Sequence, residues 1–349
     1  MDKKFISDFK VNEQVTSVFM LRKKNLKLTK YDKPYLEMTL SDKTGKIEGR
    51  LWDDAEKYNE AADTGDFVLI KGTVDKYREE KQLKVDYLVK ADERAFCYED
   101  MVRVAANREK YYNDILTYLK SIKNVWVKSL SELFVKDEKL MASFKDGIGG
   151  KSWHNAYIGG LMEHTFEVMY ISQEMCRLCG EADRDIALFG AFIHDIGKVR
   201  ELDPKKLEYT VEGGLLGHIA IGYRILTEKI SEITDFPYDL RLRLEHIILS
   251  HHGEYEQQSP VLPKTLEATI IYHADELVSQ ANAIKEIQVG QKEEGKTWSN
   301  YVTIKNRKYF IKSAAEEGWS QENKESKQSG QAGSISEEAD GSDEIGDLF

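Results

Sequence analysis

The sequence predicts a multi-domain α and β protein, in which a small β-barrel is followed by an all-α helical bundle. From about Val11 to Ala91 apolar residues alternate at every second position, which is the period of strands. After Asp92 the apolar spacing becomes helical and stays so to about Ile284. From Glu316 to Phe349 the chain is acidic, rich in Ser and Gly and poor in apolar residues, which predicts a disordered tail.

These changes of pattern predict five segments. They are residues 1–92, a nucleic-acid-binding barrel; 93–150, a helical connector; 151–284, a metal-binding helical domain; 285–315, a short segment that packs back; and 316–349, the acidic tail.

The barrel is predicted from five strand-like runs with one short helix between the third and the fourth. The expected strands are Val15–Leu28, Leu36–Leu40, Ile47–Leu51, Asp66–Tyr77 and Gln82–Val89, and the expected helix is Asp53–Ala62. This order is typical of an OB-fold, a five-stranded barrel that binds oligonucleotides across its second and third strands.

Outward positions of these two strands carry side chains that suit single-stranded nucleic acid. Tyr35 and Trp52 offer aromatic planes for bases, Arg50 offers a cation for phosphate, and Arg22 and Lys24 lie nearby in the sequence. A solvated sheet face with one exposed tryptophan explains the pattern equally well, because alternation indicates a strand and not its ligand. The order of the barrel favours nucleic acid.

The helical part is expected to contain eight helices. They are Glu99–Lys120, Lys123–Phe134, Asp137–Phe144, Asn155–Cys179, Arg184–Ile196, Gly217–Ile230, Asp239–His251 and Thr265–Ala283.

Composition excludes several classes of protein. With 349 residues, 41% hydrophobic and 32% charged, the chain can bury a sizeable core. No run approaches the ~18 apolar residues of a membrane span, and no apolar signal-peptide core follows Met1, so we expect a cytoplasmic protein without a membrane partner.

The tail from Glu316 has ten acidic residues and two lysines, so it accounts for −8 of the net charge of −11. The folded part is close to neutral. The three cysteines, Cys97, Cys176 and Cys179, are expected to be buried, reduced thiols.

All eight histidines lie between His154 and His273. Packing gives no reason to gather every imidazole in one third of a chain, whereas a metal site does. His164 falls in the middle of a core-facing helical row, where an imidazole needs a partner. That row consists of Tyr157, Leu161, His164, Val168, Ile171, Met175 and Leu178.

The dipeptide His194-Asp195 follows a helical row of small residues, Ala187, Gly190 and Ala191. Small side chains let a neighbouring helix approach closely. We expect Gly197 to end this helix, so that Asp195 turns toward the same centre as His194.

Further candidates lie downstream at His218, the pair His251-His252, and Asp275. Each alone is more often a structural or solvated residue than a ligand. Together with the upstream residues they supply five imidazoles and two carboxylates, which match the needs of two borderline metal ions. This donor set lacks thiolate and suits manganese, with iron, cobalt or zinc as alternatives.

The sequence resembles the signature of the HD metal-dependent phosphohydrolase superfamily. The residues that carry this resemblance are His164, then His194-Asp195 with Gly197-Lys198, then the distant Asp275. The additional histidines, His218, His251 and His252, resemble the members of that superfamily that hold two metals. No Gly-Tyr-Pro follows Asp275, which speaks against the cyclic-dinucleotide branch.

The order of the two domains resembles the YhaM-type 3′-to-5′ exoribonucleases, over roughly residues 11–310. The motifs that carry this resemblance are Gly159-Gly160-Leu161 before His164, Thr210-Val211-Glu212-Gly213 before His218, and Ser250-His251-His252-Gly253. It implies release of nucleoside 5′-monophosphates from single-stranded RNA, with single-stranded DNA and a homo-oligomer left open. The 3′-to-5′ direction comes from this resemblance alone.

The resemblance also implies a ligand set. One ion would be held by His164, His194, Asp195 and Asp275, and the second by His218, His251 and His252, with Asp195 bridging both.

The expected chemistry is hydrolysis of a phosphodiester by metal-activated water, without a protein nucleophile. Lys198 could hold a phosphate oxygen or interact with the carboxyl end of the helix, and phosphate is slightly favoured. His154 could contact substrate or support a ligand, whereas His246 and His273 are interpreted as structural. Two alternatives are a phosphohydrolase of small or signalling nucleotides and a non-catalytic RNA-binding protein with one structural metal.

Overall fold

The computed structural model describes residues 3–77, 80–150, 155–290, 297–302 and 306–311. Two compact units divide the chain between Ala283 and Ile284. The predicted acidic tail from Glu316 and the candidate site residue His154 lie outside the described residues.

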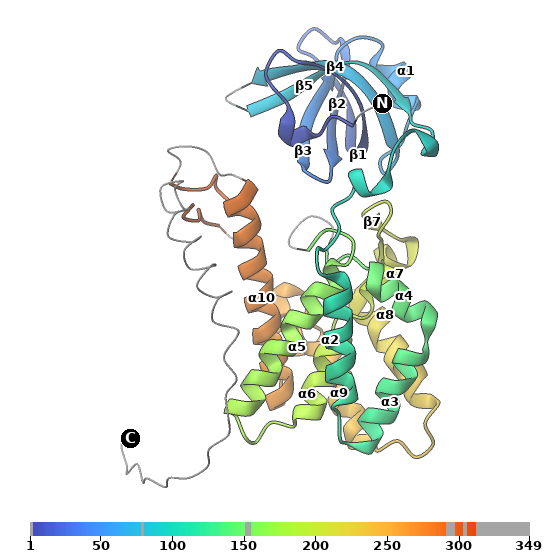
Figure 1. Cartoon of the computed structure of the whole chain (residues 1–349), viewed down its shortest axis with the longest axis vertical. Helices are drawn as coiled ribbons and strands as arrows, with labels where there is room; N and C mark the ends of the chain where they lie inside the picture. The colour runs from blue at the N-terminus through green and yellow to red at the C-terminus, as the bar shows by residue number, and fades with distance from the viewer. Residues whose placement is uncertain (1–2, 78–79, 151–154, 291–296, 303–305, 312–349) are drawn as a thin grey trace, which may run out of the picture. The chain divides into compact units, whose positions relative to one another are not determined.

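The first part of the first unit is a closed five-stranded barrel, drawn in blue to cyan in Figure 1. In the barrel the strands follow the order β1-β2-β3-β5-β4, with β3 and β5 parallel and the other pairs antiparallel. The elements are β1 (Gln14–Leu28), β2 (Pro34–Asp42), β3 (Gly45–Leu51), α1 (Ala55–Glu60), β4 (Phe67–Tyr77) and β5 (Glu80–Lys90). This architecture confirms the prediction of an OB-fold.

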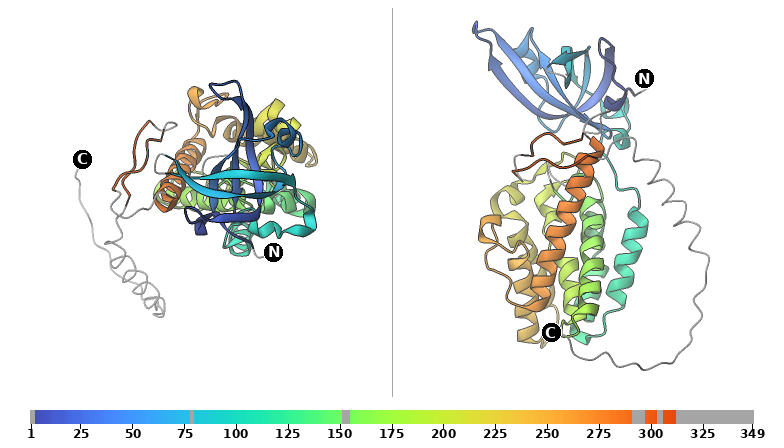
Figure 2. Two further views of the ribbon diagram at one scale, coloured as in Figure 1. Left: turned by 90° about the horizontal axis from the view of Figure 1, so that it is seen from above. Right: turned by 90° about the vertical axis from the view of Figure 1, so that its left-hand side faces the viewer.

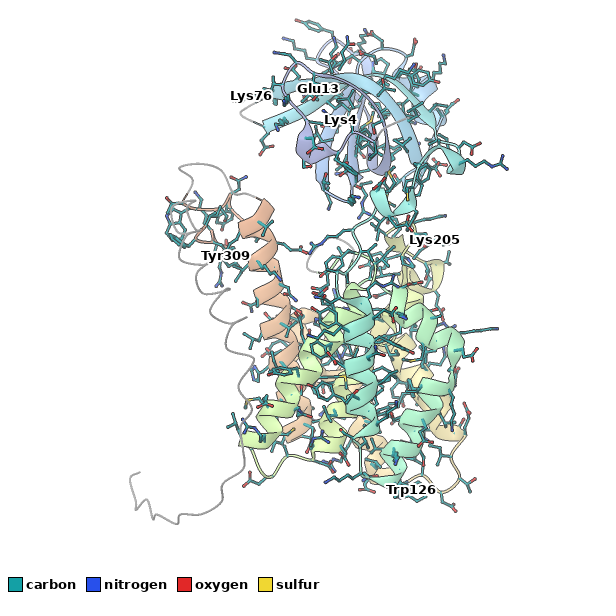
Figure 3. All side chains as sticks on the ribbon, in the orientation of Figure 1. Lys4, Glu13, Lys76, Trp126, Lys205 and Tyr309 are labelled. Atoms are coloured by element: carbon teal, nitrogen blue, oxygen red, sulfur yellow. The ribbon has the colours of Figure 1, made fainter. Side chains whose placement is uncertain are left out.

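Alternation along the strands builds the barrel core. Leu36, Met38 and Leu40 of β2 are buried at every second position. Gly72 stands where the pairing of β4 and β5 shifts register, and a Cβ there would lie 2.3 Å from the carbonyl oxygen of Lys84. Glycine is therefore required at this bulge. Outside the core, Lys4 and Glu13, labelled in Figure 3, form an ion pair at 2.8 Å.

The second part of the first unit is a helical bundle, seen from two further sides in Figure 2. Its helices are α2 (Arg108–Lys120), α3 (Val125–Lys136), α4 (Glu138–Asp146), α5 (Gly160–Leu178), α6 (Arg184–Ile193), α7 (Lys198–Glu201), α8 (Val211–Ser231), α9 (Tyr238–Ser250) and α10 (Leu266–Gly290), whose residues after Ala283 belong to the second unit. None of the described helices is long and apolar enough to cross a bilayer.

The bundle core positions the helix that carries His194. On α6, Phe189 and Phe192 pack edge-on against Phe134 of α3, with ring centroids 5.5 and 5.9 Å apart. A Cβ on Gly190 would lie 2.6 Å from Cδ1 of Ile247 on α9, so this glycine permits close helix packing. The expected role of the small residues on α6 is confirmed.

Several helix boundaries differ from the prediction. The helix expected from Glu99 begins only at Arg108, after a short 3-10 turn at Tyr98–Asp100. The helix expected from Gly217 begins six residues earlier, at Val211, and is broken at Gly217, whose φ of 71° and ψ of 159° are not helical. A small hairpin of β6 (Leu202–Asp203) and β7 (Glu208–Tyr209) was not predicted. Two-residue strands are too short to leave a periodic pattern.

The predictions for the core-facing row of α5 and for the burial of the three thiols are correct only in part. On α5, Met175 and Leu178 are 38% and 73% exposed, while Ser172 and Cys176 are buried. A helix of 3.6 residues per turn drifts away from a seven-residue row, which explains the change. Cys97 is exposed and Cys179 is half-buried, so the expectation of buried thiols is confirmed only for Cys176.

The second unit is described as far as Ile311. Here Trp298 forms an isolated bridge with Phe310, and the two rings meet edge-on at 5.9 Å. These two aromatic residues of the segment therefore contact each other.

Candidate metal centre

The first group of candidate ligands comes from α5, the end of α6 and α10. Nε2 of His164 lies 3.3 Å from Nε2 of His194 and 3.1 Å from Oδ1 of Asp275. Oδ2 of Asp195 lies 3.3 Å from Nε2 of His194 and 3.6 Å from Nε2 of His164. His164, His194 and Asp195 are buried. The four side chains thus meet at one point, and their donor atoms are imidazole nitrogens and carboxylate oxygens.

The second group comes from α8 and the end of α9. His218 and His252 approach with their Nε2 atoms 3.2 Å apart, and the ring centroids of His251 and His252 are 4.5 Å apart. Oδ1 of Asp195 lies 3.5 Å from Nε2 of His218 and 3.6 Å from Nε2 of His251. Asp195 therefore turns one oxygen toward each group.

Backbone carbonyls orient three of the five rings. Nδ1 of His194, His251 and His252 lies 2.7–2.8 Å from the carbonyl oxygen of Ala191, Ile248 and Gln257 respectively. A carbonyl only accepts hydrogen bonds, so each Nδ1 donates, and in the neutral ring Nε2 is then the nitrogen with the lone pair that can bind a metal.

Gly197 has a different role from the one expected. The helix α6 ends at Ile193, and Gly197 has a φ of −63°, so no left-handed residue ends the helix there. A Cβ on Gly197 would lie 2.0 Å from the carbonyl oxygen of His218. This glycine is needed because α8 passes against it, which brings His218 next to Asp195.

Glu201 is a site residue that the sequence did not reveal. Its Oε1 accepts a hydrogen bond from the backbone N–H of His218 at 2.9 Å and lies 3.0 Å from Nδ1 of the same residue. The break at Gly217 leaves this N–H pointing out of the helix. Burial alone would raise the pKa of Glu201, but the hydrogen bonds from His218 lower it. A carboxylate three residues after Lys198, with a glycine before His218, is the signal that could have found it.

The two groups fit divalent metal ions. Within each of the sets His164, His194, Asp195 and His218, His251, His252, the candidate ligand atoms lie within 4.8 Å of one another. Asp195 Oδ1 and His251 Nε2 are buried and have no hydrogen-bond partner among the described residues. Two buried lone pairs without a proton donor would be costly unless cations bind there.

The protonation of the side chains also suits metal binding. Burial, supported by the nearby His251, lowers the pKa of His252 to about 4, so its ring is neutral at pH 7. For Asp195, burial favours the neutral acid, but the ammonium of Lys198 opposes burial most strongly, and the pKa is lowered. The carboxylate is therefore ionised.

Lys198 lies at the centre rather than at the end of α6. Its Nζ donates to Oδ2 of Asp195 at 2.6 Å, and its side chain is 13% exposed. The ammonium therefore offsets the charge of the carboxylate. His246 accepts a hydrogen bond from the backbone N–H of Lys264 at 2.9 Å, which agrees with a structural role.

On the barrel, Tyr35 and Trp52 lie side by side. Their rings stack with centroids 4.8 Å apart and planes at 22°, and Trp52 is 36% exposed. Arg50, on the neighbouring strand β3, has its guanidinium 5.2 Å from the ring centroid of Tyr77. The three predicted residues share the outer side of β2 and β3.

The two other predicted cations are placed differently. Lys24 donates from Nζ to the carbonyl oxygens of Asn59 and Ala62, at 2.5 Å each. Arg22 occupies the irregular position in the pairing of β1 with β2, and burial lowers its pKa. Neither position could be read from alternation, because α1 covers Lys24 and the bulge redirects Arg22. The proposed RNA surface therefore does not include Arg22 or Lys24.

Family models match both parts of the chain. Residues 18–91 match the model described as an OB-fold nucleic acid binding domain, and residues 161–279 match the model described as an HD domain. The fold and the site thus define an HD-domain protein with a cluster of candidate metal ligands and an N-terminal OB-fold.

Similar proteins specify the family further. A protein named 3′-5′ exoribonuclease YhaM from Listeria monocytogenes is 31% identical over 294 residues, which are 82% of this chain and 91% of that protein. Proteins of the same name from Bacillus velezensis and Bacillus subtilis are 30% and 29% identical, and each alignment covers 86% of this chain and 95% of the relative. This chain belongs to the YhaM 3′-5′ exoribonuclease family.

Proposed function

We propose that this protein is a metal-dependent 3′-to-5′ exoribonuclease that hydrolyses single-stranded RNA to nucleoside 5′-monophosphates. The observation that carries the proposal is the position of Asp195, with one oxygen facing each group of histidines. The direction of degradation rests on the name of the relatives.

In this proposal the side chains have distinct tasks. His164, His194 and Asp275 would hold one divalent ion, His218, His251 and His252 would hold the other, and Asp195 would contribute to both. Such a pair of ions supplies a Lewis acid and water activation at neutral pH. Lys198 offsets the charge of Asp195 and directs its remaining N–H groups toward a substrate phosphate.

The barrel holds the rest of the RNA. The exposed side of the stacked pair Tyr35 and Trp52 offers a plane for a base, and Arg50 offers charge for a phosphate. Stacking does not distinguish RNA from DNA, so we propose single-stranded DNA as a weaker second substrate.

The donor set favours manganese, because imidazole and carboxylate without thiolate suit this ion, with iron, cobalt and zinc as competitors. We place the enzyme in the cytoplasm, where single-stranded RNA is its substrate.

One experiment tests both activity and direction. Single-stranded RNA labelled at its 5′ end is incubated with the manganese-loaded protein and sampled over time. A labelled ladder that shortens step by step supports the proposal, whereas immediate release of a labelled mononucleotide indicates the opposite direction. Hydrolysis of free nucleotides with an intact oligonucleotide would instead identify a small-nucleotide phosphohydrolase.

A double variant provides the control. Replacing His194 and Asp195 by alanine should abolish hydrolysis and leave binding of RNA to the barrel intact. Continued degradation by this variant with added manganese would contradict the site assignment.

A further inference from the structure

A cavity of about 680 Å³ opens beside the second group of histidines. Its lining includes polar side chains, among them Lys198, Glu201, His218 and His252, and apolar or aromatic side chains, among them Tyr209, Leu216 and Ile219. A lining that combines a lysine and candidate metal-ligand histidines with apolar and aromatic side chains suits a nucleotide, which carries both a phosphate and a base.

Two of the lining residues are exposed in the described structure. Tyr209 is 54% exposed and Leu216 is 49% exposed. Next to them in the sequence, Val211 and Leu215 are 83% and 79% exposed. Exposed side chains such as Tyr209 and Leu216 that also line a cavity indicate a binding surface.

Tyr209 is held in place by the segment that carries the site. It pairs with Leu202 in the β6–β7 hairpin, and Leu202 directly follows Glu201 in the sequence. The following residue, Thr210, donates its backbone N–H to the carbonyl oxygen of Glu201 at 2.9 Å, and its hydroxyl caps α8 by accepting from the N–H of Gly213. Glu201 in turn binds His218 through its side chain. The aromatic ring and the second group of histidines are therefore fixed to the same residue.

We propose that this cavity binds the 3′-terminal nucleotide of the RNA, with its base against Tyr209 and Leu216 and its phosphate at His218, His252 and Lys198. The proposal rests on the proposed exoribonuclease function and adds the subsite that recognises the end of the chain.

The chemistry agrees with this placement. Water adds its oxygen to phosphorus, the bond from phosphorus to the 3′ oxygen of the penultimate nucleotide breaks, and that oxygen takes the proton as a new 3′ hydroxyl. The phosphate stays on the terminal nucleotide, which leaves as a 5′-monophosphate. A base pocket beside the metal centre would therefore hold the nucleotide that keeps the phosphate and leaves.

Kinetics with two matched RNAs test the subsite. One RNA ends in adenosine, and the other ends in an abasic ribose of the same length. Tyr209→Ala should raise KM about 10-fold for the first RNA, since loss of one base–aromatic stack has this order of effect. It should leave KM for the abasic RNA unchanged. Tyr209→Phe keeps the ring and should restore the wild-type KM.

A binding measurement gives a second readout without turnover. The RNA carries the fluorescent base 2-aminopurine at its 3′ end, and a methylene group replaces the bridging 3′ oxygen of the last linkage. The full-length wild-type protein should quench the fluorescence by stacking, and Tyr209→Ala should lose this quenching. Tyr238→Ala, which removes a tyrosine that is 72% exposed on α9, is the matched control and should behave as wild type.

Each outcome decides the proposal. If Tyr209→Ala and Leu216→Ala raise KM equally for both RNAs, or not at all, the base does not lie here and the subsite is wrong, while wild-type activity still supports the exoribonuclease. If these substitutions instead change the oligomeric state and not the KM ratio, the apolar surface is an interface between copies of the chain. If the wild-type protein does not shorten RNA from its 3′ end, the exoribonuclease function itself fails and the subsite fails with it.

Discussion

Oε1 of Glu201 accepts a hydrogen bond from the backbone N–H of His218 at 2.9 Å, and the same oxygen lies 3.0 Å from the ring Nδ1 of this histidine. One carboxylate oxygen thus fixes where the second half of α8 begins and which way the ring of His218 points. A carboxylate behind a metal-binding imidazole sets its tautomer and raises its basicity.

Glu201→Gln should therefore weaken the second metal site. Loss of such a carboxylate typically lowers metal affinity about 10–100-fold. After dialysis, elemental analysis should find fewer than two ions per chain, with the first ion retained. Glu245→Gln is the matched control, because Glu245 is also buried in the bundle but pairs with Arg241 at 2.7 Å. Equal metal content in the two variants would exclude the proposed role of Glu201.

Gly197→Ala should destabilise the helical domain. The new Cβ would lie 2.0 Å from the carbonyl oxygen of His218 and 2.6 Å from the backbone nitrogen of Gly222, and backbone atoms cannot move aside cheaply. Overpacking of this kind lowers the free energy of unfolding by about 1–3 kcal/mol. Denaturant unfolding followed by circular dichroism measures the change.

Gly214→Ala provides the control within the same region. A Cβ at Gly214 on α8 meets no atom within 4 Å. Because alanine is a better helix former than glycine, the free energy of unfolding should rise by up to about 1 kcal/mol. A loss of stability at Gly214 similar to that at Gly197 would show that the close approach of α8 is not the cause.

Asp137 should make the stability of the helical domain depend on pH. Its side chain caps α4 by accepting the N–H of Leu140 at 3.0 Å and pairs with Lys229 of α8 at 3.0 Å, and these interactions lower its pKa. The stabilisation from a lowered pKa is complete above the unfolded value of about 4 and is lost as the pH falls through the folded value.

Asp137→Asn retains a capping oxygen but does not titrate. The variant should be less stable than wild type by up to about 1 kcal/mol at pH 6, and the difference should shrink as the pH falls from about 4. Denaturant unfolding at pH 6, 4 and 3 measures both proteins. A difference that stays constant down to pH 3 would contradict the assigned pairing.

Binding of single-stranded RNA to the barrel should depend on Arg50 and not on Lys24. Arg50→Gln should weaken binding of single-stranded RNA and reduce the dependence of log Kd on log salt by about one unit of slope, as expected when one phosphate contact is lost. Lys24→Gln should leave the slope unchanged, because the Lys24 ammonium is bound to the carbonyls of Asn59 and Ala62. Fluorescence anisotropy at several salt concentrations compares the two. The opposite ranking would place the RNA on another face.

Much of the fold could be predicted because it depends on patterns that are local in the sequence. Alternation at Leu36, Met38 and Leu40 indicates a strand whichever strand lies beside it. The candidate ligands could be found because imidazoles are rare and were gathered in one third of the chain.

The remaining features depend on which backbone atoms a side chain meets, and no periodic pattern records this. Glu201 looks like any helical carboxylate until the break at Gly217 exposes the N–H of His218. Lys24 alternates like a surface residue until the carbonyls of Asn59 and Ala62 surround its ammonium. Gly197 resembles a helix end, although its function is to leave room for α8.

The central claim is that Asp195 holds both ions, and metal stoichiometry tests it most directly. Elemental analysis after dialysis should find two ions per wild-type chain and one in His252→Ala, which loses a ligand of the second group only. Asp195→Ala, with its fold checked by circular dichroism, should retain neither ion. An Asp195→Ala protein that keeps one tightly bound ion, as His252→Ala does, would contradict the bridging role.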